Sequence, residues 1–423
     1  MLYHFFQWLQ NEGIRFPGSG LFQFITFRAM IALLLSLFIT MVYGKRIITL
    51  LLRKQVGESV RELGLAGEEQ KKGTPTMGGF IILLGILIPT LLFANLDKVY
   101  IKLLLLSTVW LGLVGFVDDY LKLRAKRLSQ QQGISYKKGN KDGLAGWFKV
   151  LGQVGLGIII SATLLLNDNV KVLREYKGVG KPADGVAVKY QGGTRYFVYA
   201  NEPVTTIPFI KDHEFNYAKL LPSSLRSYGW VLYMIVVIII VTAVSNGANI
   251  TDGLDGLATG VSAIIGVCLA LFIYASGNLL LADYLNIMYI PNLGEVSIFT
   301  GALIGACIGF LWYNTYPAQV FMGDTGSLAL GGIIASLAII VRKELMIPIF
   351  CAVFLVENLS VMIQVGYFKY TKKKYGEGRR VFLMSPLHHH YQKKGYHESK
   401  IAVRFWIMTL FFVVIAILSL KIR

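Results

Sequence analysis

The sequence is short of charged residues, and acidic residues are the scarcer kind. Among 423 residues only 16% are Asp, Glu, Lys or Arg, and 24 acidic residues stand against 42 basic ones. A soluble domain carries about a quarter charged residues, so this composition excludes an ordinary soluble fold. Cysteine is also scarce, and Cys268, Cys307 and Cys351 lie singly in apolar stretches without the spacing of a metal site. We therefore assign the three cysteines to packing.

What the sequence has instead is a series of long apolar runs. Hydrophobic residues make up 54% of the chain, and they form blocks long enough for membrane-spanning helices, which need roughly 20 residues each. The pattern predicts an all-α integral membrane protein, a single polytopic domain over residues 1–423 with about ten transmembrane helices. The predicted spans are 21–43, 76–95, 99–117, 148–167, 228–245, 257–276, 297–313, 327–342, 345–368 and 401–421.

Basic residues are concentrated in three loops, which predicts the orientation of the chain. The loops 44–75, 118–147 and 369–400 are rich in Lys and Arg, whereas the loops 95–100 and 276–296 have almost none. By the positive-inside rule the basic loops are cytoplasmic, and an even number of spans then leaves both termini in the periplasm. The formal charge of +18 is thus explained by loops that face the anionic lipid bilayer, and no nucleic acid partner is expected.

One polar segment, 168–227, interrupts the series between the fourth and fifth spans. Its stretches 186–190 and 194–199 carry β-branched and aromatic residues on either side of Gly192 and Gly193. This pattern predicts a small β-hairpin. Because long loops are translocated largely regardless of their charge, we expect the segment to be a periplasmic insertion.

Acidic residues gather at the span ends on the predicted cytoplasmic side, and the first of them are an adjacent pair. Asp118 and Asp119 close the third span. Neighbouring carboxylates repel each other unless a cation lies beside them, and Mg²⁺ prefers such oxygen ligands. The alternative is a solvated pair at a helix end, although carboxylates there oppose the helix dipole.

Two further segments carry acidic residues at loop positions. Asn249, Asp252 and Asp255 recur every three residues after the fifth span, so in a helix neighbouring members would lie one turn apart and converge on one ligand. Asp324 stands in a Gly-Asp-Thr-Gly-Ser string after the seventh span and is a candidate metal ligand. Phe321 lies three residues before Asp324, and a nucleobase can stack on its aromatic ring. By itself this last string also fits a simple turn and helix start.

Two basic segments complete the set. His388, His389 and His390 are consecutive, and consecutive residues do not converge on one zinc ion, so phosphate contact or proton handling suits them better. A solvated His run is the alternative. Lys71 and Thr76 lie in a Lys-Lys-Gly-Thr-Pro-Thr string that either lines a phosphate path or merely flanks the second span.

Together these segments resemble the motifs of the polyprenyl-phosphate N-acetylhexosamine-1-phosphate transferase superfamily. The resemblance runs from about Lys71 to the C-terminus, outside 168–227, and the Pro-Leu-His-His-His string at 386–390 is typical of its UDP-MurNAc-pentapeptide branch. It implies transfer of phospho-MurNAc-pentapeptide from UDP-MurNAc-pentapeptide to undecaprenyl phosphate at the cytoplasmic face of a bacterial inner membrane. It also implies a Mg²⁺ cofactor and a homodimer.

The resemblance further implies a role for individual residues. Asp324 resembles the family's Mg²⁺ ligand, Asp118 resembles the group that deprotonates the lipid phosphate, and Phe321 resembles the aromatic that stacks on uracil. The implied catalytic residues are Asp118, Asp119, Asp252, Asp324 and His388. The implied substrate-binding residues are Lys71, Thr76, Lys122, Lys149, Asn249, Asp255, Asn314, Phe321, Gln364, His389 and His390.

Alternatives remain at this stage for both the function and the mechanism. A related GlcNAc-1-phosphate polyprenyl transferase shares most of these motifs, and a membrane transporter is the rival from another class. A transporter places polar residues at mid-membrane, and Glu357 and Gln364 in the ninth predicted span are the candidates for that position. For Glu357 the alternative is a hydrogen bond within the helix bundle. For the transferase, direct attack by the lipid phosphate and a two-step route through an aspartyl-phosphate are both open.

Overall fold

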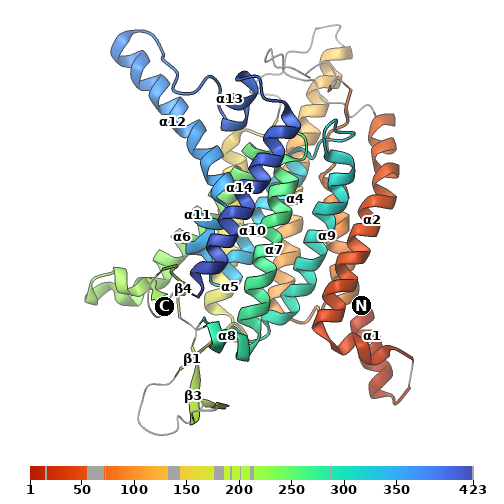
Figure 1. Ribbon diagram of the computed structural model, residues 1–423, viewed down its shortest axis with the longest axis vertical. Helices are drawn as coiled ribbons and strands as arrows, with labels where there is room; N and C mark the ends of the chain where they lie inside the picture. The colour runs from red at the N-terminus through yellow and green to blue at the C-terminus, as the bar shows by residue number, and fades with distance from the viewer. Residues whose placement is uncertain are drawn as a thin grey trace.

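The apolar runs of the sequence form long helices in the computed structural model of the chain (Figure 1). The structure describes residues 1–14, 17–54, 71, 73–131, 143–175, 185–190, 193–200, 202–209, 214–285 and 287–421. Its longer helices are α1 Leu2–Asn11, α2 Ile25–Arg53, α3 Gly79–Phe93, α4 Val99–Gln131, α5 Gly146–Leu166, α6 Gly229–Thr251, α7 Leu257–Gly277, α9 Val296–Asn314, α10 Gly323–Ile340, α12 Ala352–Tyr375 and α14 Glu398–Ser419. The shorter ones are α8 Leu279–Leu285, α11 Ile347–Phe350 and α13 Leu387–Lys393.

Within the described residues, eight helical segments are long and apolar enough to cross a membrane. A ninth is added if the bent pair of segment 344–350 and α12 counts as one span. α3 coincides with the predicted span 76–95 but has only 15 residues. That is about 22 Å of helix, against about 30 Å of bilayer hydrocarbon. The predicted helical, multi-pass class is therefore confirmed. Helix length and apolarity support eight or nine spans, and the predicted count of ten includes the shorter helix α3.

The prediction of one continuous span over 345–368 was wrong. The segment 344–350, which ends with α11, meets α12 at an angle of 80°. The break is at Cys351, whose dihedral angles of φ −102° and ψ 24° lie outside the α-helical range. Pro348 lies three residues before the break, in the first turn of α11, so the sequence carries a local signal of an interrupted helix that the prediction of one span passed over. Beyond it α12 leads away from the bundle, as Figure 1 shows.

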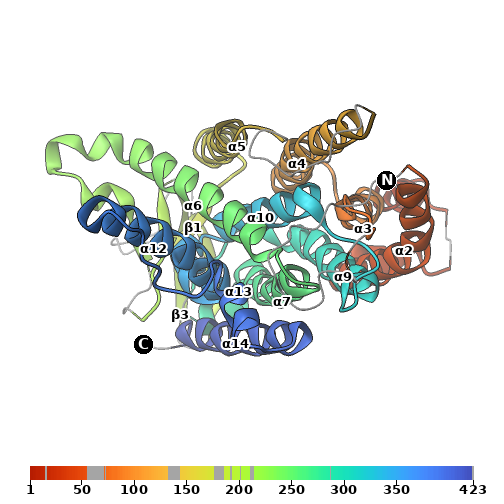
Figure 2. The ribbon, with the colours of Figure 1, turned by 90° about the horizontal axis from the view of Figure 1, so that it is seen from above.

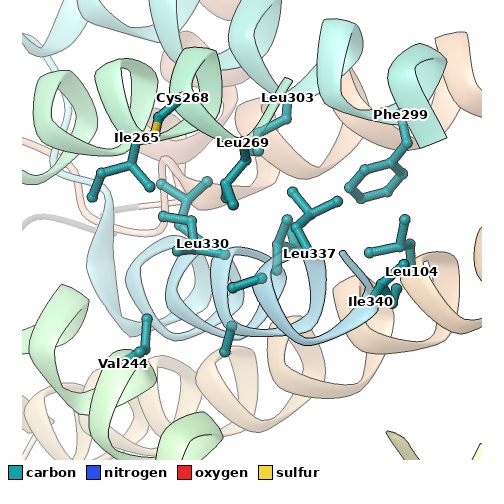
Figure 3. Close-up of a cluster of buried hydrophobic side chains, with 14 of the residues drawn as sticks. Leu104, Val244, Ile265, Cys268, Leu269, Phe299, Leu303, Leu330, Leu337 and Ile340 are labelled. Atoms are coloured by element: carbon teal, nitrogen blue, oxygen red, sulfur yellow. The ribbon is translucent and has the colours of Figure 1, made fainter. Parts of the chain in front are cut away.

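α10 lies at the centre of the bundle. In its 18-residue apolar window 89% of the residues are buried, against 28% for α2 and for α14, so the latter two are peripheral helices. Seen from above, α10 is enclosed by its neighbours α4, α6 and α7 (Figure 2). Leu330 and Leu337 of α10 pack against side chains from these helices and from α9, as Figure 3 shows. Cys268, Cys307 and Cys351 are buried free thiols, which confirms that they serve packing.

The insertion forms two small antiparallel sheets. Its strands are β1 Val172–Glu175, β2 Gly185–Tyr190, β3 Gly193–Ala200, β4 Val204–Thr206 and β5 Glu214–Asn216. β2 and β3 form the predicted hairpin, in which Tyr190 pairs with Gly193, and β1 adds to the other edge of β3. β4 pairs with β5, and the backbone N–H of Thr206 donates to the carbonyl of Arg342 at 3.0 Å. This bond fastens the insertion to the turn after α10.

The two ends of the bundle therefore differ. α13 and the far part of α12 lie at one end, called here the α13 end, and β1, β3, α1 and α8 lie at the opposite sheet end (Figure 1). Both chain termini are nearer to the sheets than to α13 in this view. α10 runs from the α13 end to the turn that holds the insertion, so its N-terminus points away from the sheets.

Candidate active site

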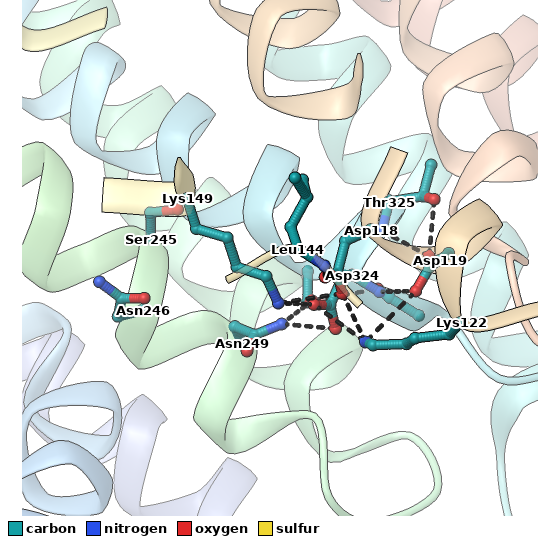
Figure 4. A network of polar contacts seen from close by, with 12 residues as sticks. Asp118, Asp119, Lys122, Leu144, Lys149, Ser245, Asn246, Asn249, Asp324 and Thr325 are labelled. Carbon is teal, nitrogen blue, oxygen red and sulfur yellow. Dashed lines mark hydrogen bonds and ion pairs between the residues drawn. The ribbon is translucent and has the colours of Figure 1, made fainter. Parts of the chain in front are cut away.

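Three carboxylates from two helices meet at the α13 end. Asp118 and Asp119 belong to α4, which continues through its predicted end at residue 117, and Asp324 lies in the first turn of α10. One oxygen atom of each carboxylate lies within 4.8 Å of the other two. Figure 4 shows the three side chains pointing toward one another. The adjacent pair in α4 is thus part of a cluster that includes a carboxylate about two hundred residues further along the chain.

Close backbone contact between α4 and α10 creates this cluster. A Cβ atom added at Gly115 of α4 would clash with the carbonyl group of Asp324, so only glycine fits there. One turn further along, Asp119 accepts hydrogen bonds from the backbone N–H groups of Asp324 and Thr325 at 3.2 and 2.9 Å. The Thr325 hydroxyl donates to the same carboxylate at 2.7 Å. Asp119 therefore caps the N-terminus of α10, where unpaired N–H groups favour a negative charge.

Two lysines neutralise most of the charge of the cluster. The Lys149 Nζ lies 2.5 Å from an oxygen of Asp324 and 2.9 Å from Asp118. The Lys122 Nζ lies 2.5 Å from Asp118 and 3.2 Å from Asp324. Asn249, in the last turn of α6, donates a hydrogen bond of 3.0 Å to the other oxygen of Asp324. Side chains from three other helices, α4, α5 and α6, therefore converge on Asp324 of α10.

A second charged cluster surrounds Lys71. Its Nζ lies 2.9 Å from Asp255 and 2.6 Å from Glu398, and Glu398 also accepts the backbone N–H of Asp255 at 2.7 Å. Burial alone would lower the pKa of Lys71, but the attraction of Glu398 and Asp255 raises it above its ordinary value. The lysine is thus a permanent cation. It also lies 5.9 Å from the centre of the Phe321 ring, within cation–π distance.

The segment around Thr76 is held against the segment around Phe321 by main-chain hydrogen bonds. The N–H of Phe321 donates to the carbonyl of Pro75, and the N–H of Gly78 donates back to the carbonyl of Phe321, both at 2.8 Å. Asn314 is buried nearby, where its oxygen accepts from the N–H of Gly256 at 3.2 Å. Asn314 therefore holds the turn between α6 and α7, and Phe321 keeps a fixed backbone.

The three histidines follow the bent helix α12. His388 is fully buried beside Glu357, and its Nδ1 lies 3.1 Å from a Glu357 oxygen. Burial, reinforced by the neighbouring His388, lowers the pKa of His389 to about 4, so His389 is neutral near pH 7. Burial and then Lys394 lower the pKa of His390 as well. A Cβ atom added at Gly253 would clash with the His388 ring, which places the histidines against the α6–α7 turn.

Several predicted residues take positions that the sequence did not indicate. Asn249, Asp252 and Asp255 would converge on one ligand only in a continuous helix, and that condition is not met, because α6 ends at Thr251 and the chain then turns. As a result Asn249 bonds to Asp324, Asp255 bonds to Lys71, and Asp252 is not one of the three clustered carboxylates. The amide of Gln364 binds the backbone of Val381 and Phe382, so it holds the loop before α13.

Sequence reasoning missed Glu398, and for Glu357 it left open a transporter role or a hydrogen bond within the helix bundle, of which the structure shows the hydrogen bond. Glu398 is the first residue of α14 and bonds to Lys71, 327 positions away in the chain. Its one sequence signal is that it is an acidic residue in the basic loop 369–400, ten positions after the first histidine of the run. Glu357 and His388 are both completely buried, and a Glu within an apolar span is a signal that it has a specific partner.

Comparisons with known proteins agree with this arrangement. Residues 101–342 match the family described as glycosyl transferase family 4. The chain is 54% identical to the phospho-N-acetylmuramoyl-pentapeptide-transferase of Flavobacterium psychrophilum, 53% to that of Flavobacterium johnsoniae and 50% to that of Porphyromonas gingivalis. Each of these matches covers 100% of both chains, so the insertion lies within the matched length. Motifs, membrane helices and full-length similarity together establish that the chain belongs to the phospho-N-acetylmuramoyl-pentapeptide-transferase family of membrane enzymes.

Proposed function

We propose that the chain transfers phospho-MurNAc-pentapeptide from UDP-MurNAc-pentapeptide to undecaprenyl phosphate and releases UMP, as the first membrane step of peptidoglycan synthesis. The observation that carries this proposal beyond family membership is the cluster of Asp118, Asp119 and Asp324 with Lys122 and Lys149 beside it. Phosphoryl transfer depends on positioning and on neutralisation of charge rather than on covalent chemistry by the protein. Carboxylates and lysines held together at a helix N-terminus supply both.

The donor set of the cluster suits Mg²⁺. Carboxylate oxygens are its preferred protein ligands, and three are within 4.8 Å of one another here. Three carboxylates and two ammonium groups leave one negative formal charge, which favours a cation over an anion. Asp324 would hold the ion, with Asp118 beside it, because Lys149 already bridges these two carboxylates. When bound, the ion would neutralise the diphosphate and stabilise the departing UMP.

The remaining charged groups have separable roles in the proposed reaction. Asp118 takes the proton of the lipid phosphate, whose oxygen then bonds to the β-phosphorus of the donor while the bond from that phosphorus to the UMP oxygen breaks. Lys122 and Lys149 turn from the carboxylates to phosphate oxygens when the donor enters. Asp119 stays on the N-terminus of α10 and holds Asp324 in place. A two-step route would instead leave the phospho-sugar on an aspartate, where a radiolabelled donor would detect it without lipid acceptor.

We place the α13 end at the cytoplasmic face of a bacterial inner membrane. The last turn of α12 carries Lys372, Lys373 and Lys374, and Arg379 and Arg380 follow the helix at this end. The positive-inside rule assigns such basic segments to the cytoplasm. The nucleotide donor, which is water-soluble, then reaches the site from the cytosol. The sheets and both termini would face the periplasm.

The contacts of two intramembrane polar residues argue against a transporter. Glu357 binds His388, and Gln364 binds the backbone of Val381 and Phe382. Both partners belong to the segment that carries the histidines. Neither residue is therefore left to form a substrate site at the middle of the membrane, which is what a transporter requires.

UMP release is the direct test of the proposed function. Purified protein incubated with UDP-MurNAc-pentapeptide, undecaprenyl phosphate and Mg²⁺ is expected to release UMP and to form a lipid-linked sugar in equal amounts. Omission of the lipid or chelation of the metal is expected to stop both. Replacement of the donor by UDP-GlcNAc separates this activity from that of a GlcNAc-phosphate transferase. Absence of UMP from folded protein with all components present contradicts the proposal.

Phe321→Leu is expected to raise KM for the donor about 10-fold, because base–aromatic stacking contributes about 1–3 kcal/mol. kcat is expected to change little, since the uracil is far from the reacting phosphorus. Initial rates of UMP release against donor concentration give both constants. Phe24→Leu is the matched control, because Phe24 is an exposed aromatic at the start of α2. An unchanged KM for Phe321→Leu would remove Phe321 from the nucleotide site.

A further inference from the structure

Glu357 and His388 form a buried pair that links the bent helix α12 to α13. Both residues have no exposed surface. One carboxylate oxygen of Glu357 accepts the backbone N–H of His388 at 3.2 Å, and the other lies 3.1 Å from the Nδ1 of its imidazole. Two contacts from one carboxylate fix both the main chain and the ring of the histidine. The ring has no freedom to turn unless the pair is broken.

This geometry determines which ring nitrogen carries the proton. An ionised carboxylate has only acceptors, so the Nδ1 of His388 must donate to Glu357. The Nε2 is then left as the nitrogen that faces away from the pair. A carboxylate on Nδ1 also stabilises the protonated imidazolium, as it does when a carboxylate orients a catalytic histidine in other enzymes.

The Nε2 of His388 has no hydrogen-bond partner among the described residues, although it is buried. A buried polar atom without a partner costs about 1–3 kcal/mol, so a specific reason for it is expected. The nitrogen faces Gly253, where an added Cβ would clash with it. Gly253 is itself exposed, and it lies in the α6–α7 turn beside Asp252. Gly253 is therefore the residue that lies between Nε2 and the solvent beside the α6–α7 turn.

We infer that Glu357 is a positioning residue that holds the Nδ1–H of His388, so that the ring, when protonated, donates its Nε2–H to a phosphate oxygen of the nucleotide donor after the Gly253 turn moves aside. The inference rests on the proposed function, because it takes the donor diphosphate as the group that Nε2 meets. Negative charge grows on the oxygens of the departing UMP as its bond to the β-phosphorus breaks. A hydrogen bond that strengthens with this charge acts on kcat more than on KM.

The test compares a substitution that keeps the size of Glu357 with one that keeps its charge. Glu357→Gln preserves the shape, but its amide N–H₂ donates to Nδ1, so the ring keeps a neutral Nε2–H and loses the positive charge that strengthens the hydrogen bond to a phosphate oxygen. We expect kcat for UMP release to fall about 100-fold, with KM for the donor changed less than about 3-fold. Glu357→Asp keeps the carboxylate and is expected to lose only about 10-fold in kcat. A purely structural role predicts the reverse order, with Gln better tolerated than Asp.

Two further measurements keep the inference falsifiable. In protein labelled with ¹⁵N-histidine at pH 8, the His388 signal, assigned by its loss in His388→Gln, should show a protonated Nδ1 in the parent chain and an unprotonated Nδ1 in Glu357→Gln. Adding Glu357→Gln to His388→Gln should lower kcat no further. Glu344→Gln is the matched control, because Glu344 is equally buried but bonds to Tyr217 at the sheet end. Its kcat should stay near that of the parent chain.

The outcomes separate this inference from the proposed function. If the parent chain releases no UMP, the proposed function fails. If the parent chain is active but Glu357→Gln retains more kcat than Glu357→Asp, the inference alone is overturned. An unprotonated Nδ1 in the parent chain overturns it as well, and that result does not depend on whether any Glu357 variant folds.

Discussion

Asp324→Asn is expected to lower kcat for UMP release by about 1,000-fold while the helical bundle stays folded. Asn has the same shape as Asp, and its oxygen can still accept the hydrogen bond from Asn249. The backbone N–H of residue 324 still donates to Asp119, so α10 keeps its cap. The substitution changes the charge of the cluster. The two remaining carboxylates and the two lysines then sum to a formal charge of zero, so the cluster no longer attracts a divalent cation.

The measurement is UMP release across a Mg²⁺ titration, with helical content followed by circular dichroism. High Mg²⁺ is expected to restore only part of the lost rate, because the ligand itself has been removed. Asp97→Asn is the matched control: Asp97 is an exposed carboxylate in the turn between α3 and α4, with 81% of its side chain accessible. A rate for Asp324→Asn within about 10-fold of the parent chain would show that the ion, if bound, is held by other residues.

The membrane helices and the hairpin could be predicted because their signals are local. An apolar run of span length and a pair of β-branched stretches around Gly192 and Gly193 each depend on neighbouring residues only. The bend at Cys351 is harder to predict, because the apolar residues continue through the break. Pro348, three residues before it, is a local signal of an interrupted helix, but it does not give the angle between the two segments.

The residues of the candidate site were easier to predict than their partners. Polar residues at the ends of apolar spans are conspicuous, so Asp118, Asp119 and Asp324 stand out in the sequence. The bond between Lys71 and Glu398 joins residues 327 positions apart, and nothing in the sequence indicates which helices bring them together. Adjacent residues also receive different tasks: Asp118 pairs with lysines while Asp119 caps α10, a division that depends on the tertiary contact of α4 with α10.

That contact leads to a prediction about a residue with no chemistry of its own. Gly115→Ala is expected to lower kcat about 100-fold, because a displacement of about 1 Å at a catalytic group has an effect of this size. The added methyl group would meet the carbonyl of Asp324 and the backbone of Thr325, neither of which can yield as a flexible side chain does. α4 and α10 must then separate, and Asp119 loses its short hydrogen bonds to the start of α10.

Gly112→Ala on the same helix isolates this effect. A Cβ atom at position 112 would lie 3.0 Å from a terminal methyl carbon of Leu83, which can rotate aside. Both substitutions remove one glycine from α4 and raise its helix propensity equally, so a general effect on the helix cancels in the comparison. Gly112→Ala is expected to keep nearly full kcat and Gly115→Ala to lose it, while both keep their helical content. Equal activity of the two variants would mean that the carboxylate cluster tolerates separation of α4 from α10. The close packing of the two helices at Gly115 would then not be needed for catalysis.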